Sequence, residues 1–78
     1  ELNRLLEDIK ESHHIPAWHG HHVKLYYATQ GRMSPPEFII FSNYPDTIPA
    51  SYKRYVTNRL QEVIGYGVPI RLRFRKKS

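Results

Sequence analysis

The sequence feature that most constrains the fold is an unbroken apolar run near the middle of the chain. Phe38, Ile39, Ile40 and Phe41 follow one another without alternation. A strand with water on one face alternates apolar and polar residues, so this strand should be covered on both faces or paired at both edges. We therefore expect Glu37–Asn43 to be the central strand of a sheet. The run itself leaves open whether Phe38 and Ile40 or Ile39 and Phe41 face the core.

Two flanking segments alternate as edge strands do. In the segment Val23–Gln30, one face carries Val23, Leu25 and Tyr27, and the other carries Lys24, Tyr26 and Ala28. In the segment from Pro69 to about Arg75, one face carries Ile70, Leu72 and Phe74, and the other carries Arg71, Arg73 and Arg75. The simplest arrangement is a three-stranded sheet with these two segments at its edges.

Two further segments show helical spacing. The segment Glu1–Ser12 has an apolar stripe of Leu2, Leu5, Leu6 and Ile9. The segment Pro49–Ile64 has an apolar face of Tyr52, Tyr55, Val56, Leu60, Val63 and Ile64, and Gly65 follows as a terminator.

These segments predict an α+β fold in the order helix–strand–strand–helix–strand, with a mixed sheet and both helices on one face. The turn region Gly31–Pro36 is short, so the first two strands should form an antiparallel hairpin. The last strand should return parallel to the central one through the second helix.

Composition points to an anionic partner. The net charge is +5 over 78 residues, and the pI is about 9.8. Such a balance favours nucleic acid first and a membrane surface second, although basic residues also keep small domains soluble. There is no cysteine, and no apolar run approaches membrane-spanning length. Because Glu1 is not a start methionine, we expect this chain to be a piece of a longer protein.

Five histidines fall in one loop between residues 13 and 22: His13, His14, His19, His21 and His22. Clustered imidazoles bind zinc, nickel and copper. However, no carboxylate or cysteine joins them, and Gly20 leaves their spacing flexible. We therefore predict a solvated loop and no physiological metal site.

Four stretches resemble the C-terminal domain of the Der (EngA) GTPases: Lys24-Leu-Tyr-Tyr-Ala-Thr-Gln30, Pro35-Pro36-Glu-Phe-Ile-Ile-Phe-Ser-Asn43, Ser51-Tyr-Lys-Arg-Tyr55 and Gly67-Val-Pro-Ile-Arg-Leu72. The resemblance covers essentially the whole chain, in the family's order. It implies that residues 1–78 are one KH-like domain, the C-terminal fragment of a cytoplasmic bacterial protein with two tandem GTPase domains that acts in large ribosomal subunit assembly.

The resemblance also implies that GTP and magnesium belong to the parent protein. The fragment has no Gly-x-x-x-x-Gly-Lys-Ser/Thr loop, so we expect no catalytic residue, cofactor or metal in it. RNA-binding KH domains clamp the backbone with a Gly-x-x-Gly loop. The corresponding segment here, Asn43 to Ala50, contains no glycine.

Two functions fit these observations. In the first, the domain contacts ribosomal RNA or a large-subunit precursor through Arg71, Arg73 and Arg75, whose roughly 6.5–7 Å spacing along a strand resembles that of successive phosphates. Further RNA-binding candidates are Lys76, Lys77, Lys24 and, for base stacking, Tyr26. In the second, the domain docks against the upstream GTPase domains of its own chain. An independent enzyme has little support, because Ser34, Ser42 and Ser51 have no assembled base.

Overall fold

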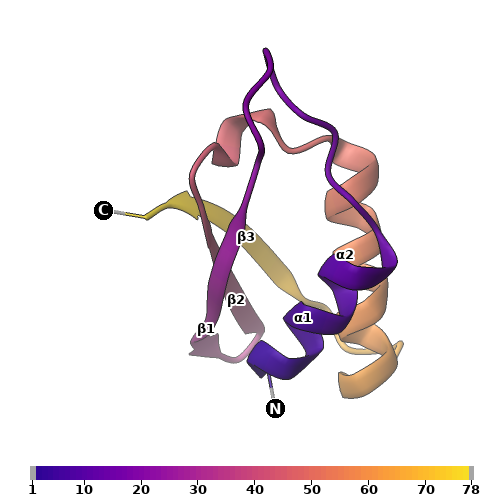
Figure 1. The fold of residues 1–78 in the computed structure, drawn as a ribbon. Helices are drawn as coiled ribbons and strands as arrows, with labels where there is room; N and C mark the ends of the chain where they lie inside the picture. Colours follow the sequence, from indigo (N-terminus) through magenta and orange to yellow (C-terminus); the bar gives the residue numbers. More distant parts are fainter. Residues whose placement is uncertain (1, 78) are drawn as a thin grey trace.

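The computed structural model describes residues 2–77, which form two helices and one sheet (Figure 1). The elements are α1 (Leu2–Ser12), β1 (Leu25–Met33), β2 (Pro36–Ser42), a short 3₁₀ helix η1 (Pro45–Thr47), α2 (Ala50–Ile64) and β3 (Arg71–Lys76). The predicted start of the first helix at Glu1 lies outside the described residues. The predicted element order is confirmed.

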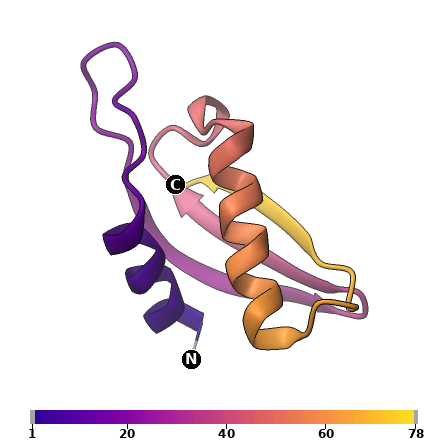
Figure 2. The same ribbon diagram turned by 90° about the vertical axis from the view of Figure 1, so that its right-hand side faces the viewer.

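The sheet has the order β1-β2-β3, with β1 antiparallel and β3 parallel to β2. Both helices lie on the same side of it, with α1 beside β1 and α2 across the strands (Figures 1 and 2). The predicted α+β class, the mixed three-stranded sheet and the central position of the apolar strand are therefore confirmed.

The core lies between the helices and one face of the sheet, and it decides the orientation that the apolar run left open. Phe38 and Ile40 are buried beneath the helices, whereas Ile39 and Phe41 lie on the opposite face and are half-buried. The buried apolar set comprises Leu6, Ile9, Leu25, Ala28, Phe38, Ile40, Ile48, Tyr52, Val56 and Leu60. The central strand is thus paired at both edges, but helices cover only one of its faces. We call the other face, which carries Ile39 and Phe41, the open face.

The alternation predicted for the first strand is wrong at Tyr27 and Ala28. Leu25 pairs with Ser42 and Tyr27 pairs with Phe41, so two steps along β1 match one step along β2. This β-bulge accommodates one extra residue and shifts the side-chain alternation after it. As a result, Leu25 and Ala28 are both buried, and both tyrosines between them are exposed.

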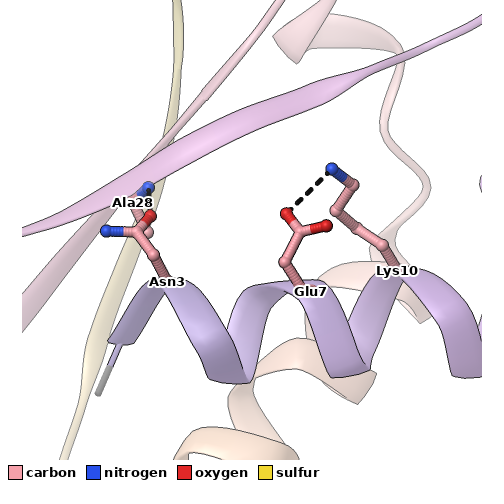
Figure 3. Close-up of polar contacts among 4 residues, drawn as sticks. All are labelled: Asn3, Glu7, Lys10 and Ala28. Carbon is pink, nitrogen blue, oxygen red and sulfur yellow. Dashed lines mark hydrogen bonds and ion pairs between the residues drawn. The ribbon is translucent and has the colours of Figure 1, made fainter.

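The outer edge of β1 is covered by α1 (Figure 3). The side-chain oxygen Oδ1 of Asn3 accepts a hydrogen bond of 2.8 Å from the backbone N–H of Ala28. Glu7 and Lys10 follow on the same side of the helix and form an ion pair of 3.1 Å. A small residue at position 28 lets the helix approach the strand closely enough for the bond to Asn3.

The turn between the first two strands is tighter than predicted. The prediction gave residues 31–36 to the turn, but β1 continues to Met33, and Pro36 begins β2 and pairs with Met33. Proline is tolerated as the first residue of a strand. Gly31 therefore lies within the sheet, where a Cβ atom would stand 2.6 Å from Oε1 of Glu37.

The second helix ends as predicted, but its apolar face was assigned too broadly. Gly65 has φ 129°, and its N–H donates to the carbonyl oxygen of Gln61 at 2.8 Å. Val63, however, is 70% exposed. The buried row Tyr52, Val56, Leu60 advances by four residues, and each such step rotates about 40° around a helix. By the last turn this row has rotated away from Val63.

The histidine loop is exposed, as predicted, but it is more ordered than a solvated loop implies. Trp18 and His21 exchange two backbone hydrogen bonds of 2.9 and 2.8 Å around His19 and Gly20, which have φ values of 49° and 79°. Positive φ at both central residues is typical of tight hairpin turns of type I′. The ring of His13 stacks on Tyr55 with 3.9 Å between centroids.

Candidate nucleic-acid interface

The predicted arginine row lies on the open face. Arg71, Arg73 and Arg75 are exposed and pair in register with Glu37, Ile39 and Phe41, which belong to that face. The intervening Leu72 and Phe74 are half-buried against the core. The alternation predicted for the last strand is therefore confirmed, and it places three guanidinium groups on one side of one strand.

One carboxylate lies within this basic face. Arg73 Nη1 is 3.7 Å from Glu37 Oε2, and the Glu37 side chain is only 13% exposed. The missing side chain at Gly31 leaves the space into which the Glu37 carboxylate fits. Arg73 is therefore partly neutralised by its neighbour, whereas no ion pair involves Arg71 or Arg75 within the described residues.

An aromatic pair borders the arginines, and sequence reasoning missed it. Tyr27 stacks on Phe41, with 4.7 Å between ring centroids and 27° between ring planes. Strict alternation placed Tyr27 with Leu25 on the core face, and the bulge overturned that assignment. The sequence did contain an indication of this arrangement. A small residue such as Ala28 fits beneath a helix better than Tyr27 does.

Tyr26 and Lys77 lie together at the end of the open face. The Nζ atom of Lys77 stands 4.8 Å from the centre of the Tyr26 ring, a cation–π geometry. The backbone N–H of Lys77 donates to the carbonyl oxygen of Ser42, which extends the β2–β3 pairing beyond the last residue of β3. Lys77 follows Arg75 by two residues, so it continues the basic row.

The other two predicted RNA-binding residues are not part of this row. Lys76 pairs with Ser42, whose side chain is buried on the helix side of the sheet. Lys24 precedes β1 and lies beside the histidine loop, where its backbone N–H donates to Oδ1 of Asn43 at 2.8 Å. The candidate residues thus divide into an arginine row, defined here as Arg71, Arg73, Arg75 and Lys77, with Tyr26 at its end, and two separate lysines.

The segment where RNA-binding KH domains carry their glycine loop has a different structure here. It contains η1 and begins with Asn43, whose Nδ2 donates to the carbonyl oxygen of His22 at 2.8 Å. The Asn43 side chain thus ties the end of β2 to the histidine loop through two hydrogen bonds. This segment has a structural role and offers no glycine-based backbone clamp.

Two further geometric findings bear on function. Among residues 2–77, no three His, Asp or Glu side chains gather closely enough to hold a metal ion. Neither described helix has the length and apolar character needed to cross a membrane. The chemistry that this face supports is electrostatic contact with anions and stacking on exposed rings.

Comparison with known proteins agrees with the resemblance. Residues 1–75 match the family described as KH-domain-like of EngA bacterial GTPase enzymes, C-terminal. The whole chain aligns with proteins named GTPase Der, at 45% identity in Geotalea uraniireducens and 46% in Trichlorobacter lovleyi. A third such protein, from Azorhizobium caulinodans, is 47% identical over 99% of the chain.

The chain spans only 18% of the length of the first two relatives. The match nevertheless covers nearly every residue, and the α-β-β-α-β order agrees with a KH-like fold. The chain therefore belongs to the family of KH-domain-like C-terminal domains of EngA bacterial GTPases.

Proposed function

We propose that the open face of this domain binds the RNA backbone and thereby helps to position its parent GTPase on a precursor of the large ribosomal subunit. The observation that carries this proposal is the arginine row: four basic side chains follow one edge of a sheet face over which neither helix lies.

The arginine row is better suited to contacting the phosphate backbone of RNA than to recognising its bases. Alternate residues of a strand repeat at roughly 6.5–7 Å, and each guanidinium can meet one phosphate. Phosphate contacts position a protein on nucleic acid without specifying sequence. The rings of Tyr26 and Tyr27, which are 40% and 39% exposed, offer surfaces on which bases can stack.

The parent protein enters the proposal through the relatives. Proteins named GTPase Der are more than five times as long as this chain, since the chain covers 18% of their length. We infer that GTP and magnesium bind in that additional length and that the protein works in the cytoplasm, where ribosomes are assembled. The domain itself then contributes binding rather than catalysis.

A salt titration of RNA binding tests the proposal. Each phosphate contact to a single strand contributes about −0.7 to the slope of log binding constant against log salt concentration. Three contacts, made by Arg71, Arg75 and Lys77, should therefore give a slope of about −2. The double variant Arg71→Gln/Arg75→Gln should flatten this slope to about −0.7 and weaken binding for all sequences alike. Arg73 is left in place so that Glu37 keeps its partner.

The matched control is Arg4→Gln/Arg54→Gln, which makes the same change in net charge at exposed positions on the two helices. It should keep the parent's slope. Equal slopes for the two double variants would mean that general charge, not the open face, drives binding, and the proposal would fail.

Docking against the upstream GTPase domains remains the second candidate, and one observation favours it. Met33, Val63 and Tyr66 are large, apolar and mostly exposed, and they lie where β1 turns into β2 and where α2 leads into β3. Both places are at the end of the molecule opposite the histidine loop (Figure 1). Replacing all three by Gln should abolish association with the remainder of the parent while leaving RNA binding intact, if this candidate is correct.

A further inference from the structure

A second basic feature lies outside the open face, beneath the histidine loop. An open groove of about 590 Å³ runs between the end of α1, the loop and the start of β1. Its basic and hydrogen-bonding lining residues are Lys10, His13, His14, His22, Lys24, Tyr26 and Tyr52. The remaining lining residues are apolar, and none is Asp or Glu. We call this feature the histidine groove.

The walls of the histidine groove are held in place by hydrogen bonds. Asn43 contacts both the carbonyl oxygen of His22 and the backbone N–H of Lys24, at 2.8 Å each. On the opposite wall, the hydroxyl of Tyr52 donates to the carbonyl oxygen of His13 at 3.2 Å. The basic side chains of the groove therefore project from backbone that is fixed before any ligand arrives, which reduces the entropy lost on binding.

The groove is continuous with the open face through one residue. Tyr26 lines the histidine groove and also a second hollow that it shares with Asn43, Tyr44, Lys76 and Lys77. A strand that follows the arginine row to Lys77 reaches Tyr26, and beyond Tyr26 lies the groove. This path includes Lys24 and Lys76, the two basic residues that the arginine row leaves out.

Few carboxylates in or beside the groove would compete with a phosphate for its basic side chains. Lys10 comes from α1 and is paired with Glu7 at 3.1 Å, an exposed contact that an incoming phosphate can replace. Lys24 precedes β1, and the hydroxyls of Tyr26 and Tyr52 come from β1 and α2. Within residues 2–77, no histidine forms an ion pair with a carboxylate.

We propose that the histidine groove is a second phosphate-binding site, which holds a phosphate group of the same RNA strand that lies on the open face. The proposal rests on the proposed function of the open face and adds a second point of attachment to it. His14, His22 and Lys24 supply the N–H donors, and the absence of acidic lining residues favours an oxyanion.

Strand length separates the two sites. From Arg71 to Lys77 the row spans six residues, or roughly 20 Å, so about four nucleotides cover it. Uridine oligonucleotides of about four and ten residues are titrated against the 78-residue chain over a range of salt. In the parent, the longer strand should bind about tenfold more tightly, with a slope steeper by about 0.7 for the additional phosphate.

The groove variant is His14→Asn/His22→Asn/Lys24→Gln. It should lose the advantage of the longer strand and bind the short strand as the parent does. The control His19→Asn/His21→Asn/Lys53→Gln makes the same replacements at residues that do not line the groove. Asparagine tolerates the positive φ of position 19. This control should keep the advantage.

The two strand lengths distinguish the groove from the open face. If the groove variant retains the full advantage of the long strand, the inference is wrong while the open-face proposal stands. If neither strand binds the parent, both are wrong.

Discussion

The two faces of β2 carry similar side chains and serve different purposes. On one face Phe38 and Ile40 are buried beneath both helices, and on the other Ile39 and Phe41 are half-buried in a layer of long side chains. Tyr27 covers Phe41 by stacking, and Arg73 and Arg75 stand beside Ile39 and Phe41 in the register. Apolar residues in a central strand can thus support a charged surface as well as fill a core.

The comparison explains why the open face tolerates hydrophobic residues without a helical cover. Arginine side chains bury their aliphatic stems along apolar surface while their guanidinium groups stay in water. Shielding by neighbouring side chains leaves Ile39 and Phe41 out of full contact with solvent. The basic residues therefore have a structural role that precedes any ligand.

The largest expected difference between the faces is in stability. Phe38→Ala should cost about 3–5 kcal/mol, because it opens a cavity in the core. That is comparable with the whole stability of a small domain. Phe41→Ala on the open face should cost about 1–2 kcal/mol, since its ring is only half-buried. Urea unfolding of both variants measures the difference, and equal losses would show that the two faces are energetically alike.

The next-largest loss of stability is expected at Asn43, which directly follows β2. Asn43→Ala removes the bonds to Lys24 N–H and His22 carbonyl oxygen and should cost about 1–3 kcal/mol. Hydrogen exchange should become faster at Lys24, whose amide loses its acceptor. Asn58→Ala, at an exposed position on α2, is the control and should change stability by less than about 0.5 kcal/mol. Slow exchange at Lys24 in the Asn43 variant would contradict the proposed tie.

A smaller change in stability is expected on the helix side of the sheet, where it should depend on pH. Burial, and then the neighbouring Tyr55, raises the pKa of Tyr52 above its usual value near 10. The unfolded chain therefore loses this proton first, and the free energy of unfolding should fall as pH rises above about 10. Tyr52→Phe should cost about 0.5–1.5 kcal/mol at neutral pH through the lost bond to His13.

The same variant should show a shallower alkaline decline than the parent. Urea unfolding at pH 9 and pH 11 measures both slopes. An identical decline in parent and variant would mean that the Tyr52 hydroxyl ionises as easily in the folded protein as in the unfolded chain.

The smallest expected stability effect lies in the middle of the open face. Glu37→Gln removes the charged partner of Arg73. It should change the free energy of unfolding by less than about 1 kcal/mol, because the contact is 3.7 Å long and solvent screens its arginine end, which is 57% exposed. It should nevertheless steepen the RNA salt slope by about 0.7, because Arg73 becomes free to meet a phosphate. Glu62→Gln breaks the comparable pair with Arg59 on α2 and should leave the slope unchanged. Equal slopes in both variants would show that Arg73 already contacts RNA in the parent.

Much of the fold was predictable because it depends on periodicity. The stripe of Leu2, Leu5, Leu6 and Ile9, the unbroken run in β2 and the alternation in β3 each fix one element and the face it buries. The order of these elements then leaves few ways to cover a three-stranded sheet. The exposed positions of Arg71, Arg73 and Arg75 follow from the same alternation.

The parts that were not predictable depend on local departures from periodicity. The bulge between Leu25 and Tyr27 brings Ala28 to the core face, and the backbone N–H of Ala28 bonds to Asn3 of α1. The ion pair of Glu37 depends on a glycine across the sheet. The ordering of the histidine loop depends on Asn43, which is about twenty residues away in sequence. Such contacts between distant residues leave no periodic trace.

The hydrogen bond between Asn3 and Ala28 also has a consequence for synthesis on the ribosome. An unpaired strand edge is a template for association with other chains, and β1 would present one along its outer side. Because α1 precedes β1 in the chain, the cover of that edge is made before the strand that needs it. The opposite edge of β2 has no such protection until β3 has been translated. During biosynthesis, the vulnerable edge is therefore the one that β3 closes last.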